Sequence, residues 1–158
     1  MHFTPEATPD NQNQPHALLT IGQRMLLLPQ REVRTLESVL DIRTGHPPVH
    51  GVGWLSFEHQ DWPVYGIDAA LTPLTAVPAS QRICVLLTLR SGYFGLLCSD
   101  VTTVAGSAVE LQPVPQAMAK PQTPLCALAL FDNRVGLVSS ALDLSVYLRV
   151  QVETLITP

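Results

Sequence analysis

Three neighbouring residues, Glu58, His59 and Asp61, carry side chains that can accept or donate protons. Together they could supply a general acid, a general base and a group that orients the base. Largely apolar segments, 54–57 and 62–67, flank them, which predicts a hairpin whose polar tip faces water. Such a tip lacks the desolvation that tunes pKa values for catalysis. The sequence therefore favours a plain turn, or a surface for a partner, over a catalytic site.

Both tryptophans of the chain, Trp54 and Trp62, flank this tip. Aromatic side chains beside a polar rim are common anchors of protein interfaces, which favours a partner. The alternative is that they pack in a core, and at least one of them is expected to do so. The residues predicted to contact a partner are Glu58, His59, Asp61 and Trp62.

Other chemistry has weaker support in the sequence. His46 and His50 have a spacing that would suit a metal on a helix, but Pro47 and Pro48 between them exclude the helix. A loop site remains as an alternative to ordinary surface histidines. The nine glycines form no phosphate-binding or dinucleotide-binding pattern, and no Gly-x-Ser-x-Gly elbow occurs. We therefore expect no catalytic residue, no metal and no cofactor.

The composition suits a protein that has a partner or forms a dimer. A chain of 158 residues suits one domain or two small lobes that share a core. With 46% hydrophobic and only 14% charged residues, it can bury a sizeable core and has little surface repulsion to oppose association. A net charge of −4 without a basic cluster argues against nucleic acid or an anionic membrane as a partner. No apolar run reaches the roughly 18 residues of a spanning helix, so membrane insertion is not expected.

The N-terminus and the cysteines indicate a cytoplasmic protein. Residues 1–15 have neither a basic start nor an apolar core, so they do not form a secretory signal, and we expect a disordered tail. Cys84, Cys98 and Cys126 are odd in number, widely spaced and placed in apolar runs. These features favour buried free thiols in a reducing compartment over a disulfide or a zinc site.

Short apolar runs separated by turn residues dominate the rest of the chain and predict β-strands. Helical spacing is expected only at 33–40, 67–71 and 141–148, and the four prolines of 111–124 predict an extended excursion. The result is a mostly β protein of about eight to ten strands, in barrels or a sandwich. Predicted strands and hairpins cover 18–28 around Gly22-Gln23, 53–66, 82–98 around Ser91-Gly92, and 125–139 around Asp132-Asn133.

Five segments between residues 17 and 148 occur in an order found in one protein family. "LLTIGQRMLLLPQREVRTLESVL" is similar to an opening hairpin, Leu-Pro-type turn and short helix, and "GWLSFEHQDWPVYGID" keeps Gly53 and Pro63 at the family's separation. "RICVLLTLRSGYFGLLCSDVTTV" has Gly95 and Leu96 in place, the Pro-x-Pro of 113–115 follows, and "LCALALFDNRVGLVSSALDL" is similar to the closing hairpin and helix. This order resembles the CheW-like adaptors of bacterial chemotaxis.

The resemblance implies a fold and a function. The expected fold is mostly β: two small five-stranded barrels of Src-homology-3 type packed on a shared hydrophobic core, with a few short helices. The CheW-like domain would span residues 17–150, between a disordered tail at 1–16 and a C-terminal tail at 151–158. In the family, the adaptor couples a chemoreceptor to a histidine kinase without catalysis or a cofactor.

The contact positions depart from the family more than the scaffold does. Ser56 stands where the family has Asn, Glu58 where it has Arg, and His59 where it has Gly. Gly66 and Ser99 replace two further Asp residues. Reversal of the charge at Glu58 leaves two interpretations: a divergent adaptor of a pilus-motility or other non-flagellar signalling array, or a CheW-like domain with an entirely different partner.

Two other classes of function stay open at this point. One is a small β-barrel enzyme or ligand-binding protein with a loop site, which would need a pocket where polar groups converge, for instance His46, His50 and Asp61. The other is a structural, oligomerising β protein without a signalling role.

Overall fold

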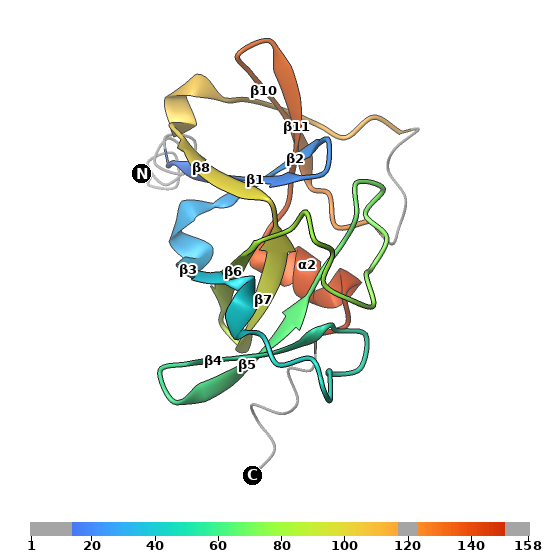
Figure 1. Cartoon of the computed structure of the whole chain (residues 1–158). Coiled ribbons are helices and arrows are strands. Elements are labelled where there is room, and N and C mark those ends of the chain that lie inside the picture. Colours follow the sequence, from blue (N-terminus) through green and yellow to red (C-terminus); the bar gives the residue numbers. More distant parts are fainter. Residues whose placement is uncertain (1–13, 117–122, 151–158) are drawn as a thin grey trace.

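The structure is a computed structural model that describes residues 14–116 and 123–150. The described residues form eleven strands, three 3-10 helices and one α-helix, arranged as two lobes, one above the other in Figure 1. The strands are β1 (His16–Ile21), β2 (Arg24–Pro29), β3 (Val33–Ser38), β4 (Gly53–Phe57), β5 (Gln60–Tyr65), β6 (Ile83–Leu89), β7 (Gly92–Cys98), β8 (Asp100–Val104), β9 (Glu110–Gln112), β10 (Ala127–Phe131) and β11 (Arg134–Val138). The helices are η1 (Gln30–Glu32), η2 (Val39–Asp41), η3 (Gly106–Ala108) and α2 (Ala141–Tyr147).

Each lobe is built on one sheet. The first lobe is a five-stranded sheet with the order β3-β6-β7-β5-β4, and the second lobe is a six-stranded sheet with the order β8-β1-β2-β11-β10-β9. The predicted fold class, two small Src-homology-3-like barrels in a mostly β protein, is confirmed, although the second sheet has six strands rather than five.

The two sheets share one topology. Among the described strands, the only parallel pair of the first lobe is β5 with β7, and that of the second lobe is β11 with β2. Every other neighbouring pair is antiparallel, so β8, β10, β11, β1 and β2 take the places of β3, β4, β5, β6 and β7. β9 is an additional strand at the edge of β10. The second lobe is therefore a circularly permuted copy of the first, completed by the N-terminal hairpin.

A single hydrophobic core joins the lobes, as predicted. Leu19 of β1, Leu26 of β2 and Leu96 of β7 all belong to it, and each is at most 1% exposed. Leu144 contributes from α2, which contacts β6. Gly95 of β7 faces a second cluster, where an added Cβ would lie 2.6 Å from the Sγ atom of Cys84. The strand therefore has no room there for a side chain.

Two predicted helices are absent. Residues 33–38 form β3 instead, because they pair with β6. Arg34 and Leu36 point outward, as alternation in a strand requires, so the helical spacing of the apolar residues is coincidental. Only the single 3-10 turn η2 follows. Residues 67–71 form a turn in which Asp68 Oδ1 accepts hydrogen bonds from the N–H groups of Ala70 and Thr72, both at 2.9 Å. The third prediction is confirmed: α2 is capped by the Ser140 hydroxyl, which accepts from Asp143 N–H.

The thiols follow the prediction at two of three positions. Cys84 and Cys98 are buried and free, and burial raises the pKa of the Cys98 thiol to about 12. Burial raises the pKa of the Cys84 thiol further still. Cys126 is also free but exposed, which corrects the expectation of a buried thiol. It immediately precedes β10, outside the sheet.

The predicted tails lie mostly outside the described residues, which exclude 1–13 and 151–158. His16 already belongs to β1, so the strand begins one residue before the predicted domain. The Pro15 carbonyl accepts from Gln30 N–H at 3.1 Å. Of the segment 111–124, β9 takes the first two residues, and 117–122 are outside the described residues. No helix in the described part of the chain is long and apolar enough to cross a membrane.

Candidate partner-binding surface

The hairpin of β4 and β5 turns at Glu58-His59, as the sequence indicates. Both residues have left-handed backbone, with φ of 51° and 66°, which suits the two-residue turn of a twisted hairpin. Strand alternation then places Trp54, Ser56 and Asp61 on one face of the hairpin. The tip thus projects polar side chains from a rigid support.

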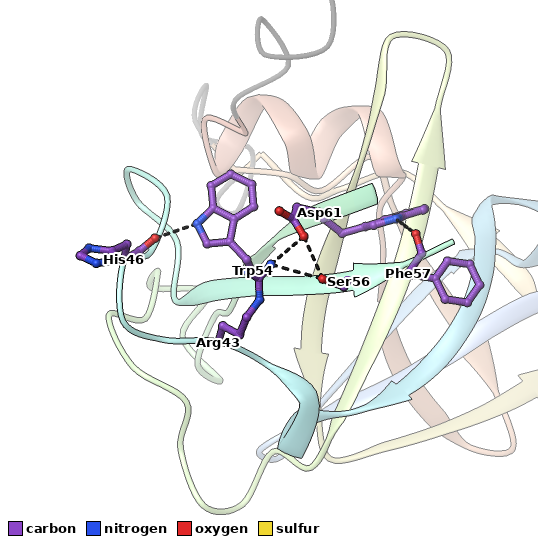
Figure 2. Close-up of polar contacts among 7 residues, drawn as sticks. Arg43, His46, Trp54, Ser56, Phe57 and Asp61 are labelled. Carbon is purple, nitrogen blue, oxygen red and sulfur yellow. Dashed lines mark hydrogen bonds and ion pairs between the residues drawn. The ribbon is translucent and has the colours of Figure 1, made fainter. Parts of the chain in front are cut away.

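Asp61 is the centre of a polar cluster on that face (Figure 2). Its Oδ1 atom accepts from Arg43 Nη2 at 2.6 Å and from the Ser56 hydroxyl at 2.8 Å. The backbone of Arg43 pairs with that of Trp54 in both directions, at 2.8 and 2.9 Å, which positions the guanidinium. Both charged side chains are more than half exposed, so the pair contributes at most about 1 kcal/mol to stability. The Arg43–Asp61 pair therefore shapes the exposed surface of the hairpin more than it stabilises the fold.

Glu58 is also paired. Both of its carboxylate oxygens accept from Arg34 Nη2, at 2.8 and 2.7 Å. The same guanidinium lies 5.3 Å from the centre of the Phe57 ring. Arg34 comes from β3, at the opposite edge of the five-stranded sheet from β4. This contact therefore brings the two edges of the first lobe together and gives the tip both signs of charge.

Trp62 corrects the sequence-based prediction of a contact residue. Its side chain is 4% exposed and packs 4.5 Å from the Tyr93 ring and 5.9 Å from the Phe57 ring, measured between centroids. Trp62 is thus part of the core beneath the tip. Trp54 is only partly buried, and its indole N–H donates to the carbonyl of His46 at 2.7 Å (Figure 2).

The loop histidines do not form a metal site with Asp61. His46 and Asp61 line one pocket of about 380 Å³, together with Arg43 and Trp54, whereas His50 lines a different groove. No group of three His, Cys, Asp or Glu side chains within residues 14–116 and 123–150 could hold a metal ion. His50 therefore does not converge with His46 and Asp61 on one pocket.

Two residues of this surface, Arg34 and Arg43, were not predicted from the sequence. Because the sequence predicts a helix over 33–40, the projection of Arg34 toward the hairpin could not be inferred. The strand alternation of 33–38 leaves no apolar pattern in the sequence, since the apolar Leu36 is exposed and Glu37 is partly buried. Arg43 lies in a loop, and nothing in the sequence indicates its bridge to β4.

Comparison with known proteins identifies the class of fold. No protein-family model matches the chain, and no curated protein matches its sequence. Among solved structures, the chain shares the fold of a CheW-type scaffolding protein. The structure in question is that of TtCheW from Thermoanaerobacter tengcongensis, with a TM-score of 0.62 over 80% of this chain and 88% of that one. The two sequences are 12% identical, so the likeness is one of fold.

Proposed function

We propose that this chain is a non-enzymatic, cytoplasmic signalling adaptor of the CheW type. It would couple a chemoreceptor-like protein to a histidine kinase, in a bacterial chemotaxis or pilus-motility pathway. The observation that carries this proposal is the likeness of fold to a scaffolding protein over 80% of the chain. Fold alone does not define function, so the surface must supply the partner.

The β4–β5 tip is the surface that we propose for one partner, through Glu58, His59 and Asp61. Its side chains are exposed, its backbone is fixed by the hairpin, and Trp62 supports it from below. Paired charges at a rim contribute more to partner choice and association rate than to affinity. Glu58 with Arg34 and Asp61 with Arg43 form two such pairs.

Calorimetric titration of the full chain tests the proposal. The partners are a purified receptor signalling tip and the regulatory domain of a histidine kinase from the same cell. We expect saturable binding to both, and a several-fold, salt-dependent change of one affinity for Glu58→Arg. Asp100→Arg, at an exposed residue of the second lobe, is the matched control and should leave that affinity unchanged.

Two outcomes would count against the proposal in different ways. Absence of binding to both domains would remove the adaptor function itself. Binding that is insensitive to Glu58→Arg at low and high salt would keep the adaptor function and make the tip a plain turn.

A further inference from the structure

A groove of about 620 Å³ lies on the first lobe, away from the Glu58 tip. The loop before β4, the loop after β5 and the end of α2 form it. Pro47, Pro48 and Pro73 line its walls, and their rings restrict backbone movement. Leu74 and Leu148 provide an apolar floor. Its size is typical of sites that take a small group or a short peptide segment.

Two residues of the groove occupy backbone positions that favour glycine. His50 has φ of 70° in a turn closed by the hydrogen bond from Gly51 N–H to the Pro48 carbonyl. Arg149 has φ of 56° directly after α2, where Val150 N–H donates to the Ser145 carbonyl. Both conformations are strained for residues with a side chain.

The strained residues of the described chain follow a pattern. Seven residues other than glycine have positive φ, and four of them are the central residues of the β4–β5 and β10–β11 turns. The other three are His50, Arg149 and Leu71. The Leu71 carbonyl accepts from the hydroxyl of Tyr147, at 2.6 Å, and Tyr147 lines the same groove. Two of these three residues, His50 and Arg149, thus line the groove, and the third contacts it through Tyr147; residues with such backbone conformations are often found at binding sites.

The groove carries positive charge, although the chain as a whole is acidic. The net charge of the protein is −4, yet no acidic side chain is among the groove's lining residues. Arg34, Arg43 and Arg134 each pair with a carboxylate, whereas none of the ion pairs within the described residues includes Arg149. The exposed guanidinium of Arg149 beside an apolar floor is complementary to a carboxylate next to an aliphatic group.

We propose that this groove binds an acidic segment of a partner protein, with a Glu or Asp carboxylate at Arg149 and a neighbouring aliphatic side chain on Leu74. His50, which also lines the groove, offers a ring nitrogen for a second hydrogen bond. The proposal goes beyond the adaptor function and does not depend on it, since no receptor or kinase is needed to test it.

The test is an NMR titration of the ¹⁵N-labelled full chain with the peptide acetyl-Leu-Glu-Leu-amide and its Gln counterpart. We expect saturable shifts at the amides of Gly51, Leu74 and Val150. The Glu peptide should bind about fivefold more tightly than the Gln peptide, because a hydrogen bond to a charged group is stronger than one to a neutral group. Arg149→Gln should abolish that preference. Arg90→Gln, at an exposed arginine that lines a different pocket, should retain it.

Glycine variants separate binding from folding. His50→Gly and Arg149→Gly should keep or raise Tm, because glycine suits both backbone conformations, and should weaken binding of the Glu peptide. Lower Tm with unchanged binding would assign both residues to the fold and overturn the proposal. Equal binding of the two peptides, or no saturable shift, would also overturn it. Tighter binding of free N-acetyl-leucine than of the Glu peptide would indicate a small-molecule site and not a partner protein.

Discussion

The tips of the two lobes have the same construction but different anchorage. Phe57 precedes the Glu58-His59 turn, and Phe131 precedes the Asp132-Asn133 turn, in which φ is also positive at both positions. In each case an arginine lies over the phenylalanine ring, at 5.3 Å in the first lobe and 5.0 Å in the second. That arginine also pairs with the acidic residue that follows the phenylalanine.

The two tips differ in which strand supplies the arginine. Arg34 reaches the first tip from β3, 24 residues away, with an N–O distance of 2.7 Å to Glu58. Arg134 belongs to the second hairpin itself and lies 3.8 Å from Asp132, whose side chain is 83% exposed. The ion pair of the first tip thus reaches across the lobe to β3, while the ion pair of the second tip stays within its own hairpin.

The supporting cores differ as well. Counted outward from the turns, the cross-strand pair Leu55 and Trp62 of the first lobe corresponds to Ala129 and Gly136 of the second. The large side chain of Trp62 thus fills the space beneath the turn of the first lobe. In the second lobe, Leu27 occupies the space next to Gly136, and a Cβ added to that glycine would collide with the Cδ1 atom of Leu27.

The largest effect is expected from removing this aromatic support. Trp62→Ala should lower the free energy of unfolding by about 3–5 kcal/mol, because it leaves a cavity among Phe57, Tyr93 and Leu55. Chemical denaturation followed by circular dichroism measures it. Trp54→Ala, at the other tryptophan, should cost about 1 kcal/mol. Equal losses for the two variants would mean that the tip does not depend on its core.

The next largest loss of stability is expected from a substitution at Gly95 of β7. Gly95→Val should cost about 1–3 kcal/mol, because the added side chain meets Cys84, Leu86 and Val64. Gly45→Val is the matched control, since a Cβ there has no neighbour within 4 Å and should change stability by less than about 0.5 kcal/mol. Thermal unfolding of both variants decides the point. A tolerated valine at Gly95 would show that the first lobe repacks readily.

A smaller change in stability is expected at Glu32, which links the segment between β2 and β3 to α2. Glu32 lies in η1, between β2 and β3, and its Oε1 atom accepts from Ala141 N–H at 2.7 Å. Burial raises the pKa of Glu32, although the hydrogen bond from Ala141 and the charge of Arg31 act to lower it. Its contribution to stability is therefore fully present below the unfolded pKa of about 4.3 and is lost as pH rises through the raised folded value.

Glu32→Gln keeps an oxygen acceptor and removes the buried charge. The variant should consequently have a higher Tm than the unaltered protein at neutral pH, and the difference should vanish in acid. Differential scanning calorimetry across this range provides the measurement. A lower Tm at neutral pH would show that the ionised carboxylate is needed to hold α2.

The smallest effect compares the tips directly. Glu58→Arg removes the pair with Arg34 and brings two guanidinium groups together, which should cost less than about 1 kcal/mol at low salt. Asp132→Arg should cost less again, because its pair is longer and more exposed. Tm values at low and high salt test this order, and the combined Arg34→Glu and Glu58→Arg swap should restore the loss. Equal sensitivity of both tips would remove the distinction in anchorage.

Much of the fold follows from local sequence signals. Asp132-Asn133 and Gly22-Gln23 are turn dipeptides between apolar runs, and both hairpins form where predicted. The same rule failed at β3, where Val33 and Leu36 happen to have helical spacing and only the partner strand β6 determines the outcome. Local patterns therefore predicted hairpins but not strands whose partner is distant.

The candidate site could be predicted only in part. The exposed position of Glu58 follows from its place in a turn, but its contact with Arg34 depends on the curvature that brings β3 to β4. The repeat of topology between the lobes also leaves no sequence period, because the order of its segments is permuted. Trp62 and Trp54 differ in burial because alternation places them on opposite faces, and the sequence did not reveal which face is inside.

The permuted order of the second lobe has a consequence for how the protein is made. β3 to β7 are consecutive, so all strand partners of the first lobe are available as soon as residue 98 has been synthesised. β1 can pair with β8 once residue 104 has been synthesised, but β2 can pair with β11 only after residue 138, and the closure entropy of such a long loop slows folding. Until then the β2 edge of the N-terminal hairpin is unpaired and is a potential site of mispairing between nascent chains.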